Sequence, residues 1–227
     1  MAVLSNRCTA AGWPDFVEHM IVGHIIILAV AIDQRRIRRT NHCGGIVRVA
    51  VYCASSDDAH HTYREDAAAL GTAIGVGGHQ LVYGGGNIGS MGALAEAAIA
   101  AGAKVISVIP RFFHERGLTY EGSTEVHITD DMQQRRRMMW ERSDGVITLP
   151  GGFGTLEEVS EMLVLNQLEL VRKPVVLANL NGFWNPLWNQ IEQMFAQRML
   201  PTGYQELIRQ AVDGTAALEG LQQLLKG

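Results

Sequence analysis

Residues 145–158 have the sequence GVITLPGGFGTLEE. The first part, Gly145 to Leu149, is a short β-branched run of the kind that forms a buried strand. Pro150 to Gly154 predict a turn, and helical spacing follows from Thr155 to Leu168. A strand that passes through glycines directly into a helix is typical of a parallel α/β sheet.

The same alternation extends to both sides of this stretch. Further strands are expected at residues 47–53, 80–83, 104–109, 126–128 and 173–178. Helices are expected from Tyr63 to the glycines at 77–78 and at residues 89–101, 131–143, 186–197 and 215–226, while residues 111–124 show no regular pattern. Strands alternating with helices of this length predict an α/β fold with a parallel sheet covered on both faces. In such a sheet, ligands bind beyond the carboxyl ends of the strands.

The composition excludes several classes of protein. Of the 227 residues, 47% are hydrophobic and 19% are charged, which excludes an intrinsically disordered chain. The net charge of −4 argues against a generic nucleic-acid binder, which would carry a basic excess. Cys8, Cys43 and Cys53 form no C-x-x-C pair, so neither a disulfide framework nor a structural zinc site is expected. Three widely spaced thiols favour a reducing, cytoplasmic compartment.

Residues 1–45 differ from the rest and are predicted to be an N-terminal extension to a single domain at 46–227. They contain an apolar run from Met20 to Ile32, shorter than the roughly 20 residues that span a bilayer. Three interpretations of the extension stay open: a disordered segment or start-site artefact, an extra packed element, or a membrane-targeting segment.

Two strand-to-helix junctions are rich in glycine, at residues 83–93 (YGGGNIGSMGA) and 149–156 (LPGGFGTL). Backbone N–H groups at such a junction, together with the positive end of the helix, suit a phosphate. Glycine also serves sharp turns and close helix packing, and that alternative stays open for each loop. Neither loop contains G-K-[ST], which disfavours a P-loop ATPase or GTPase. No dinucleotide fingerprint follows the first strand, so a mononucleotide enzyme is favoured over a hydride-transfer enzyme.

Acidic and basic side chains flank the second junction. Thr155 with Glu158 three residues later fits a helix capping box, which the local pattern favours, and chemistry by Glu158 at the mouth of the crevice is the alternative. Glu157 and Glu158 point about 100° apart on a helix, so both cannot face one substrate. Three consecutive arginines at 135–137 also cannot all face the crevice, and Arg137 is assigned to a solvated face.

Five segments in combination resemble the LOG (Lonely Guy) family, the cytokinin riboside 5′-monophosphate phosphoribohydrolases that are often mislabelled lysine decarboxylases. The segments are CASS at 53–56, YGGGNIGSMGA at 83–93, VIP at 108–110, MQQRR at 132–136 and PGGFGTLEE at 150–158. The resemblance begins near Ile46 and runs to the C-terminus. It implies one Rossmann-like domain, with a doubly wound parallel sheet, that forms a homodimer.

The resemblance also implies an activity: hydrolysis of the N-glycosidic bond of an adenosine 5′-monophosphate, N6-modified or not, releasing the free base and ribose 5-phosphate. The catalytic residues of the family match Arg135 and Glu158. The substrate-binding residues match Ser56, Gly85, Gly86, Met91, Arg136, Gly152, Phe153, Gly154 and Thr155. Neither a metal nor a cofactor is expected, and neither nucleic acid nor a membrane is an expected partner.

Two questions stay open after this comparison. Val164 stands where the family often has a threonine that contacts substrate, so the base could be adenine or an N6-prenylated adenine. The rival to an enzyme is a non-catalytic nucleotide- or cofactor-binding protein on the same fold, similar to molybdenum-cofactor carriers.

Overall fold

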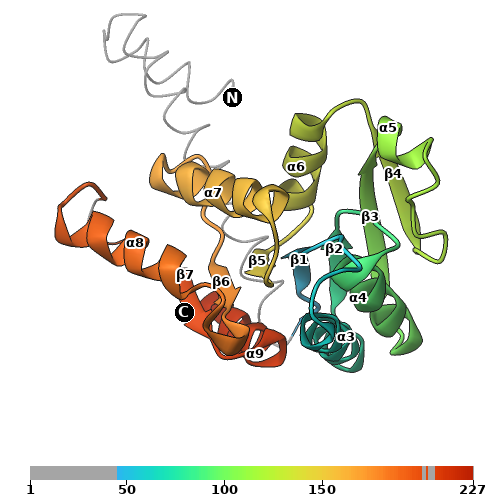
Figure 1. Cartoon of the computed structure of the whole chain (residues 1–227), viewed down its shortest axis with the longest axis horizontal. Coiled ribbons are helices and arrows are strands. Elements are labelled where there is room, and N and C mark those ends of the chain that lie inside the picture. The colour runs from blue at the N-terminus through green and yellow to red at the C-terminus, as the bar shows by residue number, and fades with distance from the viewer. Residues whose placement is uncertain (1–44, 201–202, 204–207, 227) are drawn as a thin grey trace, which may run out of the picture. The chain divides into compact units, whose positions relative to one another are not determined.

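A computed structural model describes residues 45–200, 203 and 208–226, and its described core is one seven-stranded sheet (Figure 1). The strand order is β4-β3-β2-β1-β5-β6-β7, and every neighbouring pair is parallel. The strands are β1 Arg48–Tyr52, β2 Gln80–Tyr83, β3 Lys104–Pro110, β4 Glu125–Thr129, β5 Gly145–Thr148, β6 Val175–Ala178 and β7 Ile208–Ala211. The predicted doubly wound α/β class is confirmed.

Helices cover both faces of this sheet (Figure 1). The helices are α3 His61–Val76, α4 Gly89–Ala100, α5 Arg111–His114, α6 Met132–Glu141, α7 Phe153–Gln167, α8 Asn185–Ala196 and α9 Gly214–Lys226, with a 3₁₀ turn η1 at Leu180–Gly182. Apolar residues of α3, α4 and α9 form one core cluster with the sheet, and those of α6, α7 and α8 form the other.

The sheet residues divide between these two clusters by the alternation of side chains along a strand. Val49 and Val51 of β1 lie in the cluster with α3, whereas Ala50 and Tyr52 lie in the cluster with α7. Because both faces are buried, the central strands are mostly apolar, as expected for a parallel sheet.

The order in which strands are added to the sheet changes side between β1 and β5, although all strands stay parallel. The chain builds outward from β1 to β4 and then returns to place β5 on the other side of β1. Tyr52 at the end of β1 pairs in register with Thr148 at the end of β5. Ligands bind at such a reversal, beyond the carboxyl ends of the strands. The segments that follow β1 and β5 are therefore the first place to look for a site.

Several details differ from the sequence-based expectation. Strand β7 has the sequence IRQA and was not predicted, because it is short and half polar at the sheet edge. Residues 111–114 form the short helix α5 within the segment expected to be irregular. Strand β6 begins at Val175, two residues after the predicted start.

The predicted extension at 1–45 lies outside the described residues except for Gly45. In the described part of the chain, no helix is long and apolar enough to span a bilayer.

Candidate active site

Helix α7 begins directly after the PGG turn that follows β5. Gly152 is its N-cap, in an extended conformation, and no side chain caps the helix. Thr155 lies inside the first turn, buried, with its hydroxyl packed against the backbone at Gly151. The capping box at Thr155 and Glu158 is therefore wrong: the helix starts two residues before Thr155, and Glu158 points into the protein.

Glu158 forms a buried ion pair with an arginine of the neighbouring helix. Arg135 Nη1 lies 2.7 Å from Glu158 Oε1, and the two residues are 6% and 3% exposed. Arg135 Nε also donates to the carbonyl oxygen of Val108 on β3 at 3.2 Å. The helix that carries Arg135 starts at a true N-cap, since the Asp131 carboxylate accepts from the Gln134 N–H at 2.7 Å. The structure thus brings the two predicted catalytic residues together.

The first glycine-rich loop makes room for this arginine. A Cβ at Gly84 would overlap Nη2 of Arg135. Gly84 was not singled out as a site residue from the sequence, because the sequence does not show which side chain approaches the loop. The guanidinium can occupy this position only because Gly84 has no side chain.

Burial dominates the electrostatics of Glu158. It raises the pKa of the Glu158 carboxyl above its usual range, while the charges of Arg135 and Arg136 oppose that rise. Burial also raises the pKa of the Cys53 thiol, with the Glu158 charge acting in the same direction. Cys53, which directly follows β1, is thus held as a neutral thiol, which is a poor nucleophile.

Arg136 is bound differently from Arg135. Its Nη1 lies 2.9 Å from Glu157 Oε1, and its Nε lies 2.9 Å from Glu161 Oε2. These carboxylates stand on α7 on either side of Glu158 in sequence. Arg136, predicted to bind substrate, therefore joins α6 to α7 in this structure, while Arg137 is exposed as expected.

The second glycine-rich loop is open at the start of α7. A Cβ at Gly152 or at Gly154 would meet no atom within 4 Å, so packing does not explain these two glycines. Phe153 between them is 91% exposed. An uncapped helix N-terminus with free space around its first amides is suited to an anion.

The first loop is closed by comparison. The Gly89 N–H at the start of α4 donates to Asp57 Oδ1 at 2.9 Å, and the Met91 N–H donates to the Ala54 carbonyl at 3.1 Å. The predicted binding residues of this loop are also closely packed. Gly85 lies against Ile109, and Gly86 lies against the buried Met91. The exposed Ser56 lies against Gly89. At this loop the packing interpretation accounts for the glycines.

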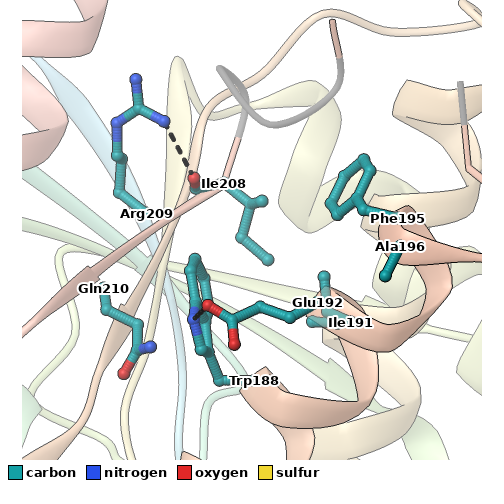
Figure 2. A pocket seen from close by; sticks show the side chains of 8 residues that line it. All are labelled: Trp188, Ile191, Glu192, Phe195, Ala196, Ile208, Arg209 and Gln210. Atoms are coloured by element: carbon teal, nitrogen blue, oxygen red, sulfur yellow. Dashed lines mark hydrogen bonds between the residues drawn. The ribbon is translucent and has the colours of Figure 1, made fainter. Parts of the chain in front are cut away.

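A cavity of about 530 Å³ lies elsewhere, between α8 and β7 (Figure 2). The side chains that line it are Trp188, Ile191, Glu192, Phe195, Ala196, Ile208, Arg209 and Gln210. Trp188 Nε1 donates to Glu192 Oε1 at 2.7 Å within it. It contains none of the predicted site residues, so we place the candidate active site by the Arg135–Glu158 pair instead. The described residues hold no group of three His, Cys, Asp or Glu side chains that could bind a metal.

Comparison with known proteins identifies the relatives of this chain. A family model described as "Possible lysine decarboxylase" matches residues 91–221. The chain is 35% identical to the probable cytokinin riboside 5′-monophosphate phosphoribohydrolase LOGL6 of Oryza sativa subsp. japonica, over 92% of this chain and 80% of the relative. It is 37% identical to cytokinin riboside 5′-monophosphate phosphoribohydrolase LOG4 of Arabidopsis thaliana, over 78% of this chain and 82% of the relative.

The chain belongs to the LOG family. Solved structures similar to this LOG protein include the molybdenum cofactor carrier protein of Chlamydomonas reinhardtii, with a TM-score of 0.62, 23% identity and coverage of 80% of this chain and 99% of that one. The molybdenum cofactor binding protein of Rippkaea orientalis matches with a TM-score of 0.60 and 22% identity, covering 79% of this chain and 98% of that one. At these identities the likeness shows a shared fold.

Proposed function

We propose that this LOG protein hydrolyses the N-glycosidic bond of a cytokinin riboside 5′-monophosphate, releasing the free base and ribose 5-phosphate. One observation carries the proposal: a buried carboxylate, Glu158, is paired with Arg135 within two turns of the open, uncapped start of α7. Its relatives at 35% and 37% identity are named as phosphoribohydrolases with that substrate.

The chemistry requires an anion near the sugar. As the bond between C1′ and N9 breaks, its electron pair leaves with the base and positive charge develops on the ribose. Glu158 stabilises that charge and orients the water whose oxygen attacks C1′. One proton of this water is lost as the new C–O bond forms, and the departing base gains a proton at nitrogen. Arg135 holds Glu158 ionised and in place.

The 5′-phosphate is assigned to the start of α7. Helix α7 begins at Phe153 with no side-chain cap, so the amides of its first turn lack partners within the helix, and the helix dipole favours an anion there. Binding energy from this remote group orients the sugar over Glu158. No metal or cofactor enters this scheme.

The choice of base is a finer proposal. We propose that the protein cleaves both AMP and N6-isopentenyladenosine 5′-monophosphate, the first making it an AMP nucleosidase. The residue that bears on this choice is Val164, which stands where the family often has a threonine that contacts substrate. It is 50% exposed on α7 and lies about 9 Å along the helix axis from Glu158. Specificity constants for the two nucleotides, measured by release of free base, test the proposal. Absence of free base from both would favour the non-catalytic carrier.

We also propose that the protein is a homodimer in a reducing, cytoplasmic compartment. Exposed apolar side chains lie along α7 and just past its end, where Phe153, Val164, Leu168 and Leu170 are 91%, 50%, 61% and 67% exposed. A row of this kind is the sort of surface that a protein partner covers. Light scattering gives the mass in solution. A monomer at micromolar concentration would contradict the dimer.

A further inference from the structure

Lys173 lies between the end of α7 and the start of β6, and its side chain reaches the far end of α6. The ammonium donates to the carbonyl oxygens of Trp140 and Ser143, the latter at 2.5 Å. It also lies 5.8 Å from the centre of the Trp140 ring. Helix α6 ends at Glu141, so the cation binds one carbonyl of its last turn, Trp140, and one just beyond its end, Ser143, where a positive charge is favourable.

The backbone of the same residue is bound to α7. Asn166 on α7 is 2% exposed, and its amide group pairs with the Lys173 main chain in both directions. Asn166 Nδ2 donates to the Lys173 carbonyl at 2.8 Å, and the Lys173 N–H donates to Asn166 Oδ1 at 3.0 Å. Lys173 therefore joins two helices, α7 through its main chain and α6 through its side chain.

These two helices carry the candidate active site at their other ends. Arg135 precedes Trp140 by about 7.5 Å along α6, and Glu158 precedes Asn166 by about 12 Å along α7. Short helices move as units, so a change in spacing at the Lys173 end alters the separation of Arg135 and Glu158. The ion pairs of Arg136 with Glu157 and Glu161 lie at the site end and do not replace this connection.

We propose that Lys173 is a positioning residue, which keeps Arg135 against Glu158 by fixing α6 and α7 at their distal ends. The inference concerns the geometry of the pair and rests on the proposed function only where turnover is the readout.

The decisive variant is Lys173→Met, which keeps most of the aliphatic stem and removes the charge and its N–H donors. The pH midpoint of the Glu158 carboxyl, followed by ¹³C NMR of the side chain, needs no substrate. We expect the midpoint to rise in Lys173→Met, because Arg135 opposes the effect of burial on Glu158 and would do so less from a greater distance. Asn166→Leu should shift it in the same direction.

Turnover provides a second readout. With AMP, Lys173→Met should lower kcat about ten- to a hundredfold while KM changes little, because misplacement of a catalytic group by a fraction of an ångström to 1 Å has effects of that size. Lys173→Arg keeps a cation and should restore most of the loss. The control is Lys104→Met, which removes a half-exposed lysine paired with Glu125 at 2.6 Å on the edge of the sheet and should change neither readout.

The outcomes separate the two ideas. A wild-type midpoint and kcat in Lys173→Met, even with a lowered melting temperature, would overturn the proposal and leave Lys173 a stabilising contact. A shifted midpoint in a protein whose wild type cleaves no nucleotide would support the positioning role and refute the proposed function. If Lys173→Met does not fold, Asn166→Leu, which removes the contacts of α7 with the Lys173 main chain, is tested by the same midpoint, and a wild-type value there would overturn the proposal.

Discussion

Arg135 on α6 and Glu158 on α7 are 23 residues apart in sequence, yet Nη1 of the arginine lies 2.7 Å from Oε1 of the glutamate. They meet because both helices cover the same face of the sheet. Removing either partner of a buried pair leaves the other charge uncompensated. Loss of either side chain is therefore expected to lower the stability of the protein as well as its activity.

Arg135→Met should lower the free energy of unfolding by about 3–5 kcal/mol, since it leaves Glu158 buried without its cation. Arg135→Met combined with Glu158→Gln should recover much of that loss, because the remaining side chain is neutral. Denaturant unfolding of both single variants and of the double variant gives the coupling directly. Additive losses would mean that the two side chains do not interact in solution.

Gly84→Ala should fold but lose activity. The added methyl group would occupy the space of Arg135 Nη2, and the guanidinium can leave only by giving up its position beside Glu158. We expect kcat to fall about ten- to a hundredfold, the size of effect seen for small misplacements. Gly220→Ala is the matched control, because a Cβ there meets no atom within 4 Å. Equal activity of Gly84→Ala and wild type would show that the arginine position is not critical.

The pH dependence of kcat/KM should show the environment of Glu158. Burial raises the pKa of this carboxyl, and the proposed mechanism uses its ionised form. Activity should therefore rise with pH through a midpoint above the roughly 4.3 of an ordinary glutamate. Lys173→Met should move this limb to still higher pH. A midpoint at or below the ordinary glutamate pKa would mean that the partners of Glu158 stabilise its charged form by more than burial destabilises it.

The 5′-phosphate should be required. The open amides at the start of α7 can donate to an anion and offer little to a neutral hydroxymethyl group. Losing two charge-assisted hydrogen bonds of about 1.5–3 kcal/mol each lowers the specificity constant by roughly 10²–10⁴. AMP should be cleaved and adenosine left almost untouched. Equal specificity constants would refute the phosphate site.

The sequence predicted the sheet well because its central strands are buried on both faces and are therefore mostly apolar. It missed β7, whose Arg209 and Gln210 interrupt the pattern at an edge that solvent reaches. Edge strands carry a weaker signal, since burial there is partial.

The site was predictable only in part. The resemblance to the family indicated Arg135 and Glu158, but the local pattern favoured a cap for the glutamate. A capping box at Thr155 requires the helix to start there, and the glycines at 151–152 allow it to start earlier. The contacts of Gly84 and Lys173 depend on which helices lie side by side, and no local spacing encodes that.

The most direct test of the account compares wild type with Glu158→Gln on AMP and N6-isopentenyladenosine 5′-monophosphate, measuring free base and ribose 5-phosphate together. Glutamine keeps the shape and an oxygen for Arg135, so the fold should persist. Glu157→Gln, on the exposed side of the same helix turn, is the control. We predict equal amounts of the two products from wild type and a rate about 10²–10⁴ lower for Glu158→Gln. A folded Glu158→Gln with wild-type turnover would contradict the central role of this carboxylate.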